Sequence, residues 1–160
     1  MRETDPRRSV VAALGRVPSG LFVVTLRRPG VETGMLVSWV QQCSFAPLLL
    51  SLAVKRGRDI LPLLTDGQPF VVNILDDTQT DMIAHFGRGF ALEQPAFVEL
   101  DVQRRDSGVI LSEALAWLEC RTIQSVSTGD HELLIAEALA GALLNDGQPM
   151  VHVRKSAAHY

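Results

Sequence analysis

The feature that most constrains the fold of this chain is a series of short apolar runs, rich in β-branched and aromatic residues, with turn residues between them. Residues 19–26 (SGLFVVTL) form one such run, and residues 48–54 (LLLSLAV) form another that is suited to a buried position. Between them, Pro29 and Gly30 predict a turn, and residues 34–47 (GMLVSWVQQCSFAP) predict one further strand. Three consecutive strands joined by turns favour a meander or a barrel.

The predicted strand over residues 34–47 carries polar groups on both of its faces. In a half-buried strand, alternation places apolar residues on one face and polar residues on the other. Here one face would carry Trp39 beside Gln41, while the opposite face would carry Ser38 beside Val40. Either both faces are partly solvated or a polar ligand binds against them.

The length and composition are those of an ordinary globular protein. The chain has 160 residues, and we expect one domain over residues 1–160. Hydrophobic residues make up 47% of the chain and charged residues 21%, which is too apolar for a disordered protein. The formal net charge of -3 argues against a general nucleic-acid binder, so we expect no nucleic-acid partner.

Neither a metal site nor a membrane segment is expected from the sequence. Cys43 and Cys120 lie far apart, and no Cys-x-x-Cys pair or His/Cys cluster accompanies them. A reducing, cytoplasmic location is therefore expected. The apolar run at residues 10–14 is too short for a signal peptide or a membrane span, so it predicts a short amphipathic helix.

The middle of the chain predicts two helices and another strand. Residues 58–64 (RDILPLL) predict a short helix, and residues 69–75 (PFVVNIL) predict a strand. Residues 78–86 predict a helix with Thr78 as its N-cap.

The C-terminal half is ambiguous from residue preferences alone. Residues 114–120 and 133–140 are rich in Ala, Leu and Glu, which favour helices. Residues 121–126 and the turn-forming residues 127–130 instead favour a β-hairpin. Periodicity does not decide between the two.

Familiar catalytic and nucleotide-binding motifs are absent from the sequence. It contains neither G-x-G-x-x-G nor a P-loop sequence, so neither a Rossmann cofactor site nor a P-loop is supported. No Ser-His-Asp triad can be assembled, and we reject a hydrolase. Lys55, Arg56 and Arg58 lie just past a predicted strand and at the start of a predicted helix, where backbone amides and the helix dipole favour an anion. This basic segment is either a phosphate site or a solvated loop.

Several short motifs, taken in order along the chain, resemble one protein family. These motifs are residues 13–20 (ALGRVPSG), Val24 and Thr25, Gly34 and Met35, Ser38, Ser44, Pro47, residues 70–75 (FVVNIL), Glu119 and Cys120, and Gly129, Asp130 and His131. Together they resemble the flavin reductase-like proteins of the FMN-binding split-barrel fold, over about residues 11–153. Residues 38–45 (SWVQQCSF) are most similar to the flavin reductase module at the C-terminal end of cyanobacterial flavodiiron proteins.

The resemblance implies a mainly β fold: an antiparallel split β-barrel with flanking α-helices. It implies a homodimer that binds flavin near the dimer interface. It also implies that residues 114–120 and 133–140 are strands of the barrel, against their helical preference. Gln41, Gln42 and Cys43 are then expected at dimer or packing positions rather than at the site.

The resemblance further implies which residues bind the cofactor and the cosubstrate. The flavin ring would lie against Leu36, Val37, Ser38, Trp39, Ser51, Leu52 and Ala53; Lys55, Arg58 and Arg88 would contact phosphate; Phe86 would lie near the flavin tail; and His131 would lie at the nicotinamide pocket. A flavin has an apolar edge and a polar edge, so its pocket must mix apolar walls with donors and acceptors. Two alternatives remain: Trp39 could simply fill the core, and Phe86 could be an ordinary aromatic residue at a helix end.

The function implied by the resemblance is that of an NAD(P)H-dependent flavin reductase. Hydride would pass from NAD(P)H to FMN or FAD without a catalytic residue of the protein, since the cofactor supplies the chemistry. Reduced flavin would then either pass to a partner oxygenase or stay bound and deliver electrons to an acceptor protein. The sequence does not distinguish FMN from FAD or NADH from NADPH.

The alternative function is an FMN-binding electron-transfer or sensor module without NAD(P)H turnover. Two departures from the family favour it. Ala46 and Pro47 replace paired prolines, and residues 155–160 (KSAAHY) replace a glycine-tyrosine pair near the pocket. A split-barrel relative that binds haem or pyridoxal phosphate is a third possibility, but no axial ligand or lysine signature favours it.

Overall fold

The computed structural model describes residues 5–155 and residue 157, and it is mainly β with few helices. The C-terminal departure at residues 155–160 therefore lies partly outside the described residues. In chain order the elements are α1 (Pro6–Leu14), β1 (Ser19–Gly20), β2 (Phe22–Arg28), β3 (Val31–Val37), β4 (Val40–Phe45), β5 (Leu48–Lys55), α2 (Leu61–Leu64), β6 (Phe70–Ile74), α3 (Thr80–Gly87), β7 (Val102–Arg104), β8 (Val109–Leu111), β9 (Ala116–Ser127), β10 (His131–Leu143) and β11 (Val151–His152).

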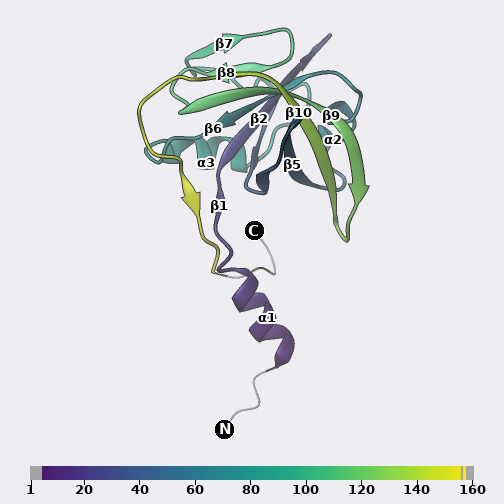
Figure 1. Ribbon diagram of the computed structural model, residues 1–160. Coiled ribbons are helices and arrows are strands. Elements are labelled where there is room, and N and C mark those ends of the chain that lie inside the picture. Colours follow the sequence, from purple (N-terminus) through teal and green to yellow (C-terminus); the bar gives the residue numbers. More distant parts are fainter. Residues whose placement is uncertain (1–4, 156, 158–160) are drawn as a thin grey trace.

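One antiparallel sheet of seven strands dominates the fold, in the order β3-β2-β6-β9-β10-β5-β4 (Figure 1). Its two edge strands, β3 and β4, follow one another in the chain and are linked only by Ser38 and Trp39. The link also bonds to β5, since the amide of Ala53 donates to the carbonyl oxygen of Trp39 at 3.0 Å. The sheet therefore closes on itself at this link, which makes it a split barrel, as predicted.

The prediction of one continuous strand over residues 34–47 was wrong. The chain leaves the sheet after Val37 and re-enters it at Val40, and the two halves pair with different partners, β3 with β2 and β4 with β5. The mixed faces seen in the sequence therefore belong to two strands with different surroundings.

Strands β9 and β10 form a long hairpin, which residues 121–130 favoured. They also make residues 116–120 and 133–140 strands, as the family resemblance implied against helical preference. Their register pairs Ala138 with Cys120, and residues 128–130 form the tip. Ala136 suits this strand because it is fully buried against the barrel core, whereas the later alanines of β10 are partly buried or exposed. Packing in the sheet outweighs an intrinsic preference that is worth less than about 1 kcal/mol per residue.

Strand β6 lies in the middle of the sheet and is buried on both faces. Phe70 and Val72 pack into the barrel core, while Val71 packs on the other side with Ile110. The one polar side chain in this strand, Asn73, is fully satisfied: its amide donates to two backbone carbonyl groups and its oxygen accepts from the amide of Leu111. This network fixes β6 against β2 and β8.

Both helices in the middle of the chain are shorter than predicted. Helix α2 begins at Leu61 rather than at Arg58, and Leu64 anchors it in the core. Helix α3 begins at Thr80, and its N-cap position is Gln79, so the prediction of Thr78 as N-cap was wrong. The Thr78 hydroxyl instead donates to Asp76 at 2.7 Å, an interaction within the preceding turn.

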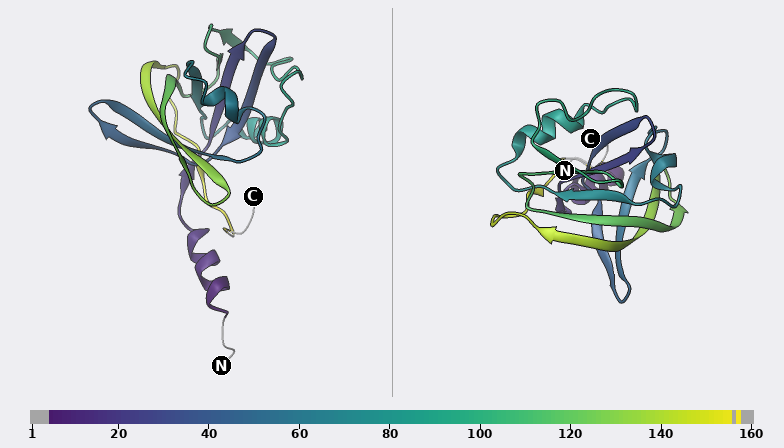
Figure 2. Two further views of the ribbon diagram at one scale, coloured as in Figure 1. Left: turned by 90° about the vertical axis from the view of Figure 1, so that its right-hand side faces the viewer. Right: turned by 90° about the horizontal axis from the view of Figure 1, so that it is seen from above.

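Two segments project from the barrel. Helix α1, which confirms the predicted N-terminal helix, extends away from the sheet and buries none of its residues (Figure 1). The β4–β5 hairpin forms an arm that stands out from the body, as Figure 2 shows. Leu48 in this arm is 55% exposed, so the predicted burial of residues 48–54 holds only for the inner part of β5.

No helix within the described residues is long and apolar enough to cross a membrane.

Candidate functional site

A pocket of about 270 Å³ opens at the seam of the barrel, between β3 and β5. Helix α3 covers one side of it and β11 reaches its other end. The residues that line it are Leu21, Met35, Leu36, Val37, Ser38, Ala53, Val54, Lys55, Arg58, Ile83, Phe86, Gly87, Gly89, His131 and His152. Most of the lining is apolar, with a small number of polar groups, which is the usual character of a cofactor site.

The apolar side of the pocket depends on close packing between α3 and β3. Phe86 is 1% exposed, and its ring approaches Gly34 so closely that a Cβ built at that glycine would lie 2.9 Å from a ring carbon. Only a residue without a side chain lets α3 lie at this depth. Phe86 and Leu36 thereby reach the pocket from opposite elements.

Two cations mark one end of the pocket, where β5 ends. Lys55 and Arg58 both line it and are exposed to solvent. Arg58 approaches Gly89 of the segment after α3, which has a positive φ of 76°. The expected contribution of a helix dipole is wrong, because α2 begins only at Leu61 and has four residues. The two side chains supply the positive charge themselves.

Ser38 supplies a hydroxyl that is buried in the pocket without a partner. The residue is 5% exposed, and its Oγ makes no hydrogen bond within the described residues. A buried hydroxyl left unpaired costs about 1–3 kcal/mol, so such groups are rare unless a ligand satisfies them. Its position at the link between β3 and β4 directs a free donor and acceptor into the seam.

His131 lies beside Lys55 in the paired strands β10 and β5, and it is 6% exposed. Its Nδ1 is 2.7 Å from Oδ1 of Asp130, and its ring lies 4.7 Å from the ring of Trp39. The hydrogen bond with His131 holds the pKa of Asp130 below its usual range. The imidazole is thus fixed on one side by a carboxylate and on another by an indole.

His152 is a pocket residue that the sequence did not reveal. It belongs to β11, whose two residues pair with β1, so that Ser19 lies opposite His152. No motif surrounds it, and a strand of two residues leaves no periodic signal in the sequence. Only the return of the C-terminal segment to β1 brings it to the pocket.

Eight of the residues predicted to bind flavin or nicotinamide line this pocket, and four do not. Those in the lining are Leu36, Val37, Ser38, Ala53, Lys55, Arg58, Phe86 and His131. Those outside the lining are Trp39, Ser51, Leu52 and Arg88.

Each of the four residues outside the lining has other contacts. Leu52 is fully buried in the barrel core, and the Ser51 hydroxyl donates to the carbonyl oxygen of Gln41 at 3.3 Å. The Arg88 guanidinium lies 4.7 Å from the centre of the Phe90 ring. The Trp39 ring packs against the ring of His131, so it lies behind a residue of the lining rather than in the lining itself.

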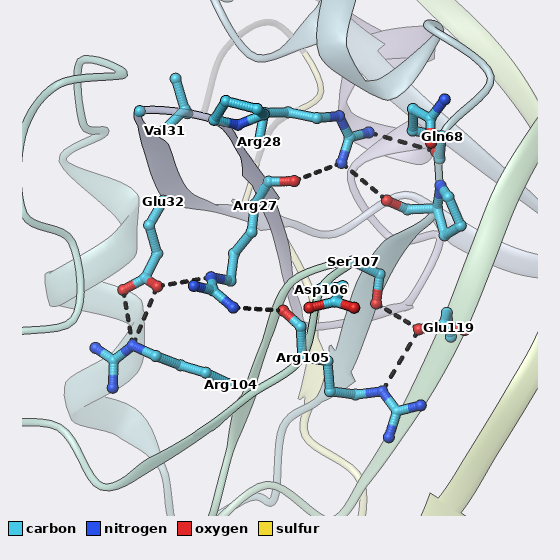
Figure 3. A pocket seen from close by; sticks show the side chains of 13 residues that line it. Arg27, Arg28, Val31, Glu32, Gln68, Arg104, Arg105, Asp106, Ser107 and Glu119 are labelled. Atoms are coloured by element: carbon cyan, nitrogen blue, oxygen red, sulfur yellow. Dashed lines mark hydrogen bonds and ion pairs between the residues drawn. The ribbon is translucent and has the colours of Figure 1, made fainter.

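A larger hollow of about 1240 Å³ lies at the opposite end of the β2–β3 hairpin, and its arginines are already paired (Figure 3). Arg27 and Arg104 both bond to Glu32, at 3.0 and 3.1 Å. Arg105 and Ser107 both converge on Glu119. This hollow therefore offers a ligand little uncompensated charge, in contrast to the smaller pocket, and size alone does not identify the site.

Two further kinds of chemistry find no support in the described part of the chain. No cluster of three or more His, Cys, Asp or Glu residues there could hold a metal ion. Burial raises the pKa of the Cys120 thiol to about 12, so this thiol stays protonated within the core.

Comparison with known proteins identifies the family. The model of the flavin reductase like domain matches residues 14–159. The chain belongs to the flavin reductase-like family. This confirms the resemblance of the motifs, and it shows that the seam pocket lies in a domain of flavin reductase type.

Curated relatives of this flavin reductase-like chain are larger proteins. A relative from Synechocystis sp. named as a diflavin flavoprotein A is 41% identical over 150 residues, which cover 92% of this chain and 25% of the relative. A second, from Nostoc sp. and also named as a diflavin flavoprotein A, is 37% identical over 161 residues, covering 99% of this chain and 28% of the relative. The chain thus spans about a quarter of the length of these relatives.

Solved structures share the fold of this flavin reductase-like chain. The NADH:FAD oxidoreductase SgcE6 of Streptomyces globisporus C-1027 superposes with a TM-score of 0.83 at 22% identity, covering 97% of this chain and 93% of that one. The styrene monooxygenase flavin reductase of Pseudomonas putida S12 has a TM-score of 0.75 and 27% identity, with 94% and 93% covered. Both matches extend over almost the whole of each chain, and the split-barrel prediction is confirmed.

Proposed function

We propose that the chain is an NAD(P)H-dependent flavin reductase whose seam pocket binds FMN or FAD. The observation that carries this proposal is the buried, unpartnered hydroxyl of Ser38, in an apolar pocket with Lys55 and Arg58 at one end. A flavin mononucleotide unit has the matching chemistry: an apolar ring edge, a polar ring edge and an anionic phosphate. Membership of the flavin reductase-like family supports the same ligand.

The pocket residues divide into groups that suit the parts of a flavin. Lys55 and Arg58 would hold the phosphate by charge-assisted hydrogen bonds. Leu36 and Phe86 would exclude water from the apolar part of the ring, and Ser38 would bond to its polar edge. Bound flavin would supply the chemistry by accepting a hydride from NAD(P)H, which leaves as NAD(P)⁺.

His131 is the residue that we propose for the nicotinamide side of the pocket. Asp130 and Trp39 fix its ring, so its contribution is to position the nicotinamide ring rather than to transfer a proton. Trp39, although outside the pocket lining, would act through this contact.

We further propose that the chain works as a homodimer built around the projecting β4–β5 arm. Phe45 at the tip of the arm is 86% exposed, and Leu48 and Leu143 are also exposed. Large apolar side chains left exposed on a projecting arm, as Phe45 and Leu48 are, are typical of an interface with another protein. The exposure of Gln41, Gln42 and Cys43 in the same arm fits the expectation that they contact a second copy.

A second candidate function is a module that keeps its flavin and has no NAD(P)H turnover of its own. The observation that favours it is the likeness of the chain to a quarter of each diflavin flavoprotein. Within such a larger protein, the electrons could arrive and leave through other domains. In either case we propose that the electrons pass to an oxygenase or to another acceptor protein.

An anaerobic titration separates the two candidates. The purified chain is mixed with FMN or FAD and then with NADH or NADPH. The visible absorbance of oxidised flavin, which is lost on reduction, is followed throughout. Bleaching that exceeds one equivalent of protein supports the reductase, and bound flavin that is not bleached supports the module. No affinity for either flavin would refute both.

A further inference from the structure

The ionisable residues in the lining of the seam pocket are all basic. They are Lys55, Arg58, His131 and His152, and the part of the chain that the structure describes contributes no Asp or Glu to this lining. A histidine side chain is neutral or cationic and never anionic. The ionisable groups of the pocket lining therefore bring no negative charge to it.

The two acidic residues next to His131 in sequence do not reverse this balance. Asp130 is 80% exposed at its side chain and is bonded to His131. Glu132 accepts a hydrogen bond from the Ser127 hydroxyl at 2.9 Å and lies 3.7 Å from Arg56. Neither carboxylate lines the pocket, although the Asp130 carboxylate offsets part of any positive charge on His131. The Oε2 atom of Glu132 is buried without a hydrogen bond, and its nearest cation is Arg56.

A C-terminal strap, residues 149–155, carries His152 into this basic wall. The strap is tied down before His152, because Met150 donates to the carbonyl oxygen of Leu75 at 3.0 Å. It is tied down after His152 as well, since the Arg154 guanidinium lies 4.8 Å from the Trp39 ring centre. His152 is thus held at the pocket by contacts on both sides, and the ladder between β11 and β1 fixes its backbone.

The charge of this wall distinguishes the two redox states of a flavin. The oxidised ring is neutral near pH 7, whereas the reduced ring readily loses its N1 proton and becomes an anion. Basic groups in a partly buried site favour a ligand that carries negative charge, because low dielectric strengthens their interaction. We propose that this pocket binds reduced flavin more tightly than oxidised flavin, and that His152 is a specificity-determining residue for this preference.

This inference rests on the proposed flavin site and decides the fate of the reduced flavin. Tighter binding of the reduced form raises the midpoint potential of bound flavin above that of free flavin. A tenfold preference corresponds to about 30 mV for a two-electron couple. Such a pocket retains reduced flavin and passes electrons onward, rather than releasing the flavin.

The test is spectroelectrochemical titration of the flavin-loaded chain, with free FMN in the same cell as reference. We expect the midpoint potential of the bound flavin to lie at least about 30 mV above that of the free flavin. His152→Gln keeps a hydrogen-bond donor but can carry no charge. We expect this variant to bind reduced flavin about tenfold less tightly, while its affinity for oxidised flavin changes by less than about twofold.

Lys155→Ala is the matched control, because Lys155 is an exposed cation of the same strap and lies outside the pocket lining. This variant is expected to leave the potential of bound flavin unchanged. A bound potential at or below that of free flavin would overturn the inference, as would equal losses of both affinities in His152→Gln. Either result leaves the proposed flavin site intact, whereas a chain that binds no flavin refutes the site and the inference together.

Discussion

At the scale of single residues, the seam pocket is defined by a hydroxyl that the protein leaves unpaired. The other buried polar side chains at the centre of the fold are satisfied: the Thr25 hydroxyl donates to the carbonyl oxygen of Val109 at 2.7 Å, and Asn73 bonds three backbone groups. Ser38 is the exception inside the pocket. Among the described residues, the other buried side-chain atom without a hydrogen bond is Oε2 of Glu132, which lies 3.7 Å from Arg56. The unpaired Ser38 hydroxyl is therefore informative about the pocket.

Replacing Ser38 by alanine should therefore affect folding and binding in opposite directions. Removing an unpaired buried hydroxyl is expected to leave the flavin-free chain as stable or to stabilise it by up to about 1 kcal/mol. Flavin affinity is expected to fall about fivefold to tenfold, since one hydrogen bond to the ring is lost. Urea unfolding of the free chain and fluorescence titration with FMN measure the two effects.

The control for this variant is Ser51→Ala. Ser51 lies outside the pocket lining, and its hydroxyl already donates to Gln41. It should retain flavin affinity. Loss of stability in Ser38→Ala without loss of affinity would mean that Ser38 only supports the fold.

The basic end of the pocket makes a second prediction at this scale. Lys55→Ala combined with Arg58→Ala should weaken FMN binding by about a hundredfold or more, because two charge-assisted contacts to phosphate are removed. Isothermal titration calorimetry with FMN measures the loss, and riboflavin, which has no phosphate, should show little change. Arg56→Ala is the control, since Arg56 pairs with Glu132 and does not line the pocket. Equal losses in the two variants would place the phosphate elsewhere.

At the scale of elements, the end of β2 is held to the turn before β6 by one arginine. Arg28 donates to both carboxylate oxygens of Asp66, at 2.8 and 3.0 Å, and also to the carbonyl oxygen of Pro69. The hydrogen bond from Arg28 is the main cause of a lowered pKa at Asp66. This clamp stabilises the end of β2 and the start of β6, away from the seam pocket.

The clamp predicts how stability depends on pH. Since the pKa of Asp66 is lower in the folded state than in the unfolded state, its contribution is fully present above about pH 4 and is lost as the pH falls through the lowered value. Asp66→Asn should remove this part of the acid sensitivity, so that its free energy of unfolding falls less steeply below pH 4 than that of the unmodified chain. Urea unfolding at several pH values measures both slopes.

Glu113→Gln is the matched control, because it removes one exposed carboxylate elsewhere. It should keep the acid sensitivity of the unmodified chain. Identical slopes for Asp66→Asn and the unmodified chain would show that the clamp does not contribute.

The elements also show where sequence patterns succeeded and where they failed. The turn at Pro29 and Gly30 was visible because both residues have strong conformational preferences, and Gly30 has a φ of 76°. The break at Ser38 and Trp39 was not visible, because no Gly, Pro, Asn or Asp marks it and the strand-like pattern continues through both residues. The strand ends there because β3 pairs with β2 whereas β4 pairs with β5, and the sequence does not show which strands are neighbours.

At the scale of the whole molecule, both projecting segments carry large apolar side chains that no part of the described chain covers. Val10 and Leu14 of α1 are more than half exposed, as are Phe45 and Leu48 of the arm. A helix as short as α1 is only marginally stable in water by itself. Both segments therefore fit an assembly larger than one chain, and the arm is the part that carries an exposed aromatic residue.

Phe45→Ser should accordingly shift the assembly toward monomers. Interface aromatic residues often contribute more than about 2 kcal/mol, so the dissociation constant of the dimer is expected to rise at least about thirtyfold. Light scattering coupled to size-exclusion chromatography, over a range of protein concentrations, measures this shift. Folding should be unaffected because Phe45 is 86% exposed in the single chain.

The control is Val98→Ser, which removes an apolar side chain that is 59% exposed and lies outside the arm. It should leave the association unchanged. A chain that is monomeric before any substitution would refute the proposed homodimer.

The sequence by itself determined several strands of the N-terminal half, the turn at Pro29 and Gly30, the N-terminal helix and, through its ordered motifs, the family. These are local properties: residue preferences, turn chemistry and short sequence motifs, all of which can be recognised without knowing the tertiary structure. It also placed Ser38 and the basic residues after β5 in the candidate site. The tertiary structure alone decided that the strand breaks at Ser38, that Trp39 lies behind the pocket, and that His152 lies in its wall. Those outcomes depend on which distant segments pack together, because burial and the pairing of β1 with β11 act across more than a hundred residues of chain.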